Sequence, residues 1–469
     1  MKKILLTILA VLAMSGMAVA QTAPSDINLH RNEDGSWSFI MPGRNLVMST
    51  ESFSTNDTVN GHYLAGVPEG WLILALGDTV PVSNDSLRRT TPITEGTPVT
   101  IVPTGNLRRI KSITLVDEAP AGPPSWKLTL SSPAKDLCII AKGGVIAQQT
   151  LDVASTEFTV EMPELTSQTV NIVATDGSGN CWYCTQENMS FAIGQTYQSS
   201  PTMTALGTES SADVYKMTEA GTIPAGKTVV LSGVTISGGS ITCSGNANII
   251  LMGSNSVTAA ANTAAIEIGG SGTTLTITGS GSLTVNGGSY AAAIGTGYAN
   301  NASVAGGNIE INGGTITATG GQSSAAIGTG YAYQNGSNEC GAITINGGTV
   351  TAYGGYAGIG TGGANQSSNE CGDITINGGT VTATGGQRSA AIGTGNASNS
   401  GSNECGAITI STGVTSVTAT MGNRSPNSIG KGYAANSGTQ ACGTITIGGD
   451  ATTYADGVTT SPFTYPTAP

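Results

Sequence analysis

Charged residues and histidine are scarce in this sequence. Only 10% of the 469 residues are charged, and 29 acidic against 17 basic residues give a formal net charge of −12. A nucleic-acid-binding protein needs a basic footprint for the phosphate backbone, so we expect no nucleic-acid partner. The two histidines, His30 and His62, both precede residue 206, which excludes histidine-dependent catalytic triads from the rest of the chain.

Long apolar runs are missing after the first twenty residues. Residues 1–20 combine two lysines, an apolar run and a small-x-small end at Ala18 and Ala20, which predicts a signal peptide and a mature chain from Gln21. We therefore expect an exported protein, secreted or held at a bacterial cell surface. No cysteine stands where a lipid anchor needs one, and no later run reaches about 18 apolar residues, so we expect no membrane span in the mature chain.

Aromatic residues are few and unevenly placed. All four tryptophans and four of the five phenylalanines precede residue 206, whereas the rest of the chain is rich in Gly, Thr, Ala, Ile, Asn and Ser. The change predicts two architectures in an all-β protein. We expect small β-sandwich-like modules over 21–118 and 119–205, followed by a different domain over 206–469.

The C-terminal half is repetitive. Pairs of apolar residues around one polar residue recur with steps of 34, 34, 31, 34 and 37 residues, at Leu275/Ile277, Ile309/Ile311, Ile343/Ile345, Ile374/Ile376, Ile408/Ile410 and Ile445/Ile447. A second apolar row and a third row of IGTG-like motifs follow, so each unit should hold three short strands between Gly-rich corners. One unit cannot bury its apolar residues, but stacked units can. The repeat predicts a parallel β-helix of about eight coils, right-handed like most parallel crossovers.

Two ladders of identical residues follow from the repeat. Cys340, Cys371, Cys405 and Cys442 should stack on successive coils as a structural ladder of buried thiols, with disulfides between neighbouring coils as the alternative. Glu339, Glu370 and Glu404 precede three of them and should form a carboxylate ladder in solvent, with Ca²⁺ left open. Ligands are not clustered as metal sites require, so we expect no metal and no cofactor.

The loops after each GTG motif are the variable part of the repeat. They carry Tyr, Asn, Gln and Ser, which suit both the hydroxyls and the apolar faces of sugars, and which also suit plain polar turns. The candidate glycan-binding residues are Tyr298, Tyr331, Tyr333, Asn335 and Tyr433. We expect the tyrosines to form a column, interrupted at Gly363 and Asn396.

Catalytic patterns are hard to find. No GxSxG elbow is present, and the five basic residues after residue 206 are scattered along the sequence, so we expect no enzyme and assign no catalytic residue. A polysaccharide lyase or glycoside hydrolase on a β-helix is the main alternative. A remote alternative is ice binding by outward threonines, such as Thr315/Thr317, Thr349/Thr351 and Thr380/Thr382.

Three stretches resemble known families. The segment DGSWSFIMPGRNLVMST resembles the end of internalin-type surface repeats, and residues 126–204, with FTVEMP and TVNIVATDGSGNCWYC, resemble fimbrillin-like modules. Residues 206–469 look like the Gly-rich β-helix of secreted or surface proteins of Bacteroidales, some of them carbohydrate-binding. The resemblance implies surface exposure and supplies no catalytic residues. With the polar edge loops, it leads us to expect adhesion, with a polysaccharide or surface glycoprotein as partner. The GSGN lead-in to CWYC predicts a hairpin, which argues against thioredoxin-like chemistry.

Overall fold

The computed structural model describes residues 123–452, 454 and 457–466, together with the backbone of nine strands between His30 and Val116. The chain divides into two compact units, residues 1–124 with 192–195, and residues 125–191 with 196–469. The described residues contain no helix, and therefore no helix long and apolar enough to cross a membrane. The all-β prediction is confirmed.

The strands of the first unit form three sheets. Their members are β1 (His30–Arg31), β2 (Trp37–Ile40) and β8 (Pro98–Ile101); β4 (Tyr63–Ala65), β9 (Leu107–Val116), β3 (Asn45–Ser52) and β7 (Ser86–Arg88); and β5 (Trp71–Ile73) with β6 (Thr79–Pro81). Strands β5 and β6 pair antiparallel. The sequence also predicts a hairpin at Gly77 and Asp78, and those two residues lie outside the described part.

Residues 125–205 form one sheet that folds over its own core. The strands are β10 (Ser125–Ala141), β11 (Gly144–Glu161), β12 (Leu165–Thr175), β13 (Cys181–Phe191), β14 (Thr196–Ser199) and β15 (Thr204–Ala205). Register shifts divide β10, and Trp126 from one half and Leu137 from the other share the same core. The turn between β12 and β13 is closed by Asp176, whose Oδ1 accepts the backbone N–H of Ser178 at 2.8 Å. The predicted hairpin before CWYC is thereby confirmed.

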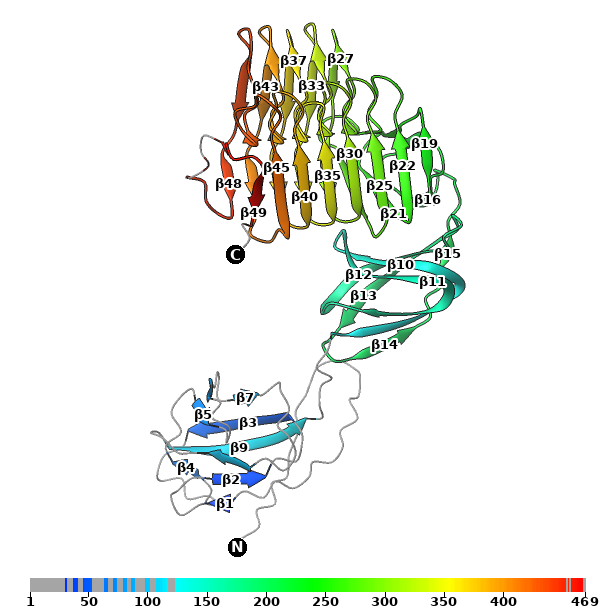
Figure 1. The fold of residues 1–469 in the computed structure, drawn as a ribbon. Helices are drawn as coiled ribbons and strands as arrows, with labels where there is room; N and C mark the ends of the chain where they lie inside the picture. The colour runs from blue at the N-terminus through cyan, green and yellow to red at the C-terminus, as the bar shows by residue number, and fades with distance from the viewer. Residues whose placement is uncertain are drawn as a thin grey trace. The chain divides into compact units, whose positions relative to one another are not determined.

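The rest of the chain winds through three core sheets (Figure 1). The first core sheet contains β16 (Val214–Lys216), β18 (Lys227–Ser232), β21 (Ala247–Met252), β24 (Thr274–Gly279), β29 (Asn308–Ile311), β34 (Ile343–Ile345), β39 (Ile374–Ile376), β44 (Ile408–Ile410) and β48 (Ile445–Ile447). The second contains β19 (Thr235–Ser237), β22 (Ser254–Thr258), β25 (Ser282–Asn286), β30 (Thr315–Thr319), β35 (Thr349–Tyr353), β40 (Thr380–Thr384), β45 (Ser416–Thr420) and β49 (Phe463–Tyr465). The third contains β17 (Gly221–Ile223), β20 (Ile241–Cys243), β23 (Ile266–Glu267), β26 (Ile294–Gly295), β31 (Ile327–Gly328), β36 (Ile359–Gly360), β41 (Ile392–Gly393) and β46 (Ile429–Gly430). Neighbouring strands are parallel except β45 and β49, so the predicted parallel β-helix is confirmed.

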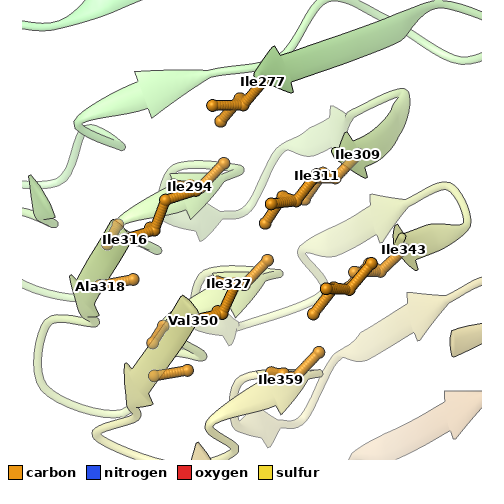
Figure 2. Packing of buried hydrophobic residues seen from close by; sticks show 14 of the residues in the cluster. Ile277, Ile294, Ile309, Ile311, Ile316, Ala318, Ile327, Ile343, Val350 and Ile359 are labelled. Carbon is orange, nitrogen blue, oxygen red and sulfur yellow. The ribbon is translucent and has the colours of Figure 1, made fainter. Parts of the chain in front are cut away.

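The apolar rows of the three core sheets meet in the interior. Figure 2 shows Ile309 and Ile311 of β29 pointing toward Ile316 of β30 and Ile294 of β26. Each row repeats in register; Ile311, for example, pairs with Ile345 on the next coil, and both are fully buried. The middle threonines of the ITI strands point outward because side chains alternate along a strand. Stacking identical rows therefore produces one continuous core.

The four coils from β26 to β45 each contain five strands, where the sequence predicted three. The loops after the GTG motifs form two further sheets, drawn above the core strands in Figure 1. The short edge sheet contains β27 (Ala299–Asn300), β32 (Ala332–Tyr333), β37 (Ala364–Asn365) and β42 (Ala397–Ser398). The long edge sheet contains β28 (Ser303–Ala305), β33 (Ser337–Cys340), β38 (Ser368–Cys371), β43 (Ser402–Cys405) and β47 (Thr439–Cys442). These strands were missed because their inward residues are small or polar, and so they lack the apolar alternation that marks a strand.

Candidate functional site

The site with the most organised side chains is the tyrosine cluster beside the short edge sheet. Tyr298 follows the first complete GTG corner and Tyr331 follows the next. Their rings are parallel within 1°, with centroids 5.8 Å apart. Tyr333 of β32 stacks on Tyr331 at 6.0 Å, and Tyr290 lies 5.2 Å from Tyr298 and 5.6 Å from Tyr331. Three of the five candidate glycan-binding residues are therefore in contact.

The stacking controls which part of each ring is free. Tyr331 is half-buried among the neighbouring rings, and burial raises the pKa of its phenol to about 12. Burial also raises the pKa of Tyr298. Because the ring faces pack on one another along the helix axis, the cluster offers ring edges and hydroxyl groups to a ligand more than open ring faces. The hydroxyls remain protonated, and they act as hydrogen-bond donors and acceptors at neutral pH.

The gap expected at Gly363 is filled by a tyrosine that the sequence analysis did not select. A Cβ added to Gly363 would overlap the ring of Tyr356 and lie 3.1 Å from Cδ2 of Tyr331. The ring of Tyr356 therefore occupies the place that a side chain at position 363 would take. The 31-residue step of this coil, which is shorter than its neighbours, was the available signal that the coil turns its corner with a different residue.

The column continues at Tyr433 with a different partner. Tyr433 is 38% exposed, and the guanidinium carbon of Arg388 lies 5.5 Å from its ring centroid. The coil between carries Asn396, which is buried. Tyr433 therefore has one face on arginine and the rest of the ring toward solvent, which is the arrangement a stacked sugar needs.

Amide groups run beside the tyrosines on the short edge sheet. Asn399 donates to Oδ1 of Asn365 at 3.1 Å, and Asn436 donates to Oδ1 of Asn399 at 3.0 Å. The candidate residue Asn335 is exposed in a left-handed conformation with φ of 61°, and its backbone N–H donates to the carbonyl of Gln366. Its side chain is thus on the turn that joins the two edge sheets, in solvent.

The glutamates of the long edge sheet lie in register. Glu339 pairs with Glu370, Glu370 pairs with Glu404, and all three side chains are exposed. The ladder ends where Glu404 pairs with Ala441. The described residues contain no group of three His, Cys, Asp or Glu side chains that could hold a metal ion.

The asparagines before these glutamates form a buried polar row that the sequence analysis did not assign. Asn338 is 1% exposed; it accepts the hydroxyl of Thr296 at 2.5 Å and donates to the carbonyl of Gly297 at 2.8 Å. Thr296 belongs to the first complete GTG motif, so this motif and the asparagine tie the long edge sheet to the third core sheet. The motif is therefore a structural corner with a buried hydroxyl.

The cysteines also lie in register. Cys340, Cys371 and Cys405 are buried, Cys442 is partly buried, and all four are free thiols. Cys405 Sγ lies 3.0 Å from Cys442 Sγ and donates to it. This hydrogen bond raises the pKa of Cys405 with help from burial, and it lowers the pKa of Cys442, which Lys431 lowers further.

A separate cleft of the second unit lies away from the tyrosine cluster and contains few groups that could act in catalysis. It has a volume of about 750 Å³ and is lined by residues of β11 and by the glycine corners between the first and second core sheets. Among its lining residues Glu310 is the one carboxylate, and it accepts hydrogen bonds from Asn312 at 3.0 Å and Asn346 at 3.2 Å. Glycoside hydrolysis ordinarily uses two carboxylates, so this cleft does not supply the pair.

Comparison with known proteins recovers the repeat. A family model described as a beta helix repeat matches residues 309–331, 343–363 and 374–396, which are three consecutive coils from the first core sheet to the residue after the GTG motif. Neither a curated protein nor a solved structure matches the chain. The C-terminal region of this chain is a parallel β-helix solenoid that contains beta helix repeats.

Proposed function

We propose that this chain is a non-enzymatic, exported surface protein that binds an extended polysaccharide, or the glycan of a surface glycoprotein, along the edge sheets of its β-helix. The modules before the helix serve as spacer or docking units. The binding surface consists of the tyrosine cluster and the amides of the short edge sheet.

The observation that carries the proposal is the register of the polar groups. Ala332 and Tyr333 pair with Ala364 and Asn365, and these pair with Ala397 and Ser398, so each coil places one polar side chain at the same position, one strand spacing further along. Strands in a sheet are about 4.8 Å apart, which gives a regular row of hydroxyl and amide groups. A polymer can contact several coils at once, so weak contacts add to a useful affinity.

The outward threonines of the second core sheet are less suited to sugars. Thr349 and Thr380 pair in register, but the adjacent columns offer short hydroxyls and, at Tyr353, one isolated exposed ring. Sugar recognition commonly combines an apolar platform with hydrogen-bonding groups, and here these are the exposed ring of Tyr433 and the amide row that ends at Asn436.

Affinity gel electrophoresis of the mature chain through a panel of soluble polysaccharides tests the proposal. We expect at least one polymer to retard the protein, and the double variant Tyr333→Ala, Tyr433→Ala to lose most of that retardation. Tyr353→Ala is the matched control, because Tyr353 is a 46% exposed ring on β35 of the second core sheet. Loss of retardation in the control with none in the double variant would move the site to the threonine face.

A further inference from the structure

Two arginines that are 36 residues apart in sequence occupy the same position on adjacent coils. Arg388 and Arg424 both adopt the left-handed conformation, with φ of 65° and 69°, and the backbone N–H of Arg388 donates to the carbonyl of Asn423 at 2.8 Å. Tyr290 and Ser323 hold the same position on earlier coils, with φ of 64° and 66°. The basic residues after residue 206 are scattered along the sequence, and the coil repeat brings these two to equivalent positions on adjacent coils.

The same backbone link connects this position to the tyrosine column at two places. Tyr331 donates its N–H to the carbonyl of Tyr290 at 2.8 Å, and Tyr433 donates to the carbonyl of Arg388 at 3.0 Å. The arginines therefore continue the line of Tyr290 and Tyr331 toward the C-terminal end of the helix. A polymer that lies along the tyrosines reaches the arginines.

The two guanidinium groups are not neutralised within the described part of the chain. No carboxylate there lies within ion-pair distance of Arg388 or Arg424, whereas Lys227 pairs with Asp213 at 2.7 Å. The backbone positions of the two arginines are about one strand spacing, 4.8 Å, apart, and like charges on neighbouring strands repel each other. An anion bound between them would relieve this repulsion and gain charge-assisted hydrogen bonds.

Arg388 is held in place before any ligand arrives. Its guanidinium lies over the ring of Tyr433, and its Nε is buried without a hydrogen-bond partner. Stacking on an aromatic ring fixes the plane of the guanidinium and lowers the entropy lost when it binds an anion. A sugar on the exposed part of Tyr433 would bring its own substituents to this group.

We propose that the ligand of the edge is an acidic polysaccharide, whose carboxylate or sulfate groups bind Arg388 and Arg424 while its neighbouring sugars contact Tyr433 and the tyrosine cluster. The proposal rests on the glycan binding proposed above and adds the charge of the ligand. The net charge of −12 does not prevent this binding. At physiological salt, charges further away than a Debye length of about 8 Å are screened, so an acidic group at the site is attracted mainly by the two nearby arginines.

The test uses matched pairs of polymers that differ only in charge. Polygalacturonate is compared with its carboxyl-reduced form, and dextran sulfate with dextran, by affinity electrophoresis and titration calorimetry of the full mature chain. We expect the acidic member of at least one pair to bind about tenfold tighter or more, and which pair responds tells carboxylate from sulfate. Arg388→Gln with Arg424→Gln should abolish the difference, and Arg424→Gln alone, which keeps the contact between Arg388 and Tyr433, should reduce it.

The control variant, Lys127→Gln with Lys135→Gln on β10, removes two positive charges away from the arginines. It should keep the preference for the acidic polymer over the neutral one. Equal binding of acidic and neutral members by the wild type overturns the inference and leaves the glycan-binding proposal standing. A control that loses the preference as fully as the arginine variant overturns it too, because the preference would then reflect overall charge. Absence of binding to every polymer, neutral and acidic, overturns both proposals.

Discussion

Tyr298 and Tyr331, which belong to successive coils, have parallel rings with centroids 5.8 Å apart. In a solenoid, the residue that repeats at one position stacks on its own copy, so the ring faces are used by the protein. A ligand can then contact the tyrosine hydroxyls, the ring edges and the exposed ring of Tyr433. The tyrosine cluster therefore has a structural role and a recognition role, and substitutions must separate the two.

Tyr331→Ala should destabilise the helix by about 2 kcal/mol, because Tyr331 contacts three other rings and each aromatic pair contributes about 0.5–1.5 kcal/mol. Tyr331→Phe should retain the stability, since the ring remains. Denaturant unfolding of both variants measures the difference. Wild-type stability of Tyr331→Ala would show that the stacked rings contribute nothing.

Ile359→Asp should unfold the coil stack, at a cost of about 4 kcal/mol or more, because it places an unpaired charge at a fully buried position between two coils. Thr349→Asp, on the exposed side of β35, is the matched control and should melt like the wild type. Circular dichroism melting compares them. Cooperative melting of Ile359→Asp at the wild-type temperature would contradict the inward direction of this row.

Cys442 should be the most reactive thiol of the ladder. Its pKa is lowered, so its thiolate persists to lower pH, whereas the pKa values of Cys371 and Cys405 are raised and these thiols stay protonated at neutral pH. Iodoacetamide at pH 7 followed by peptide mass mapping should label Cys442 first, and denatured protein should label every cysteine without reductant. A Cys340–Cys371 disulfide in native protein would refute the free-thiol ladder.

The threonine face should not bind ice. Thr315, Thr349 and Thr380 form an in-register column beside a second column of Thr317, Thr351 and Thr382. The array is only two columns wide, because the third column, through Thr319 and Thr384, is broken by Tyr353. Nanolitre osmometry of the purified chain should show no thermal hysteresis. Hysteresis that disappears on Thr349→Lys would assign this face an ice-binding function.

The sequence predicted those strands that carry a regular pattern of apolar side chains, and it missed those that do not. The ITI rows were predictable because Ile343 and Ile345 are apolar on both sides of an outward threonine, and the coil length then placed each row on its copy. The edge strands were not predictable, because their inward residue Asn338 is polar. Its hydrogen bond with Thr296 is a tertiary contact that the sequence does not show. Tyr356 was missed for a similar reason: it reaches the site from a shortened corner.

The residues that stack on one another in neighbouring coils could have been predicted from the repeat length alone. Arg388 and Arg424 differ by 36 residues, which is close to one coil, and that spacing was the available signal. The positions of the modules before residue 119 depend on contacts that no periodic pattern records. Their predicted likeness to internalin-type and fimbrillin-like modules stays a prediction.

The central claim, that the edge sheets bind polysaccharide, is tested most directly by amide hydrogen exchange of the mature chain with and without a retarding polymer. Bound polymer should slow exchange in the segments around Tyr298, Tyr333 and Tyr433, and leave the second core sheet at Thr349–Tyr353 unchanged. Protection confined to the second core sheet, with none at the edge sheets, would contradict the account.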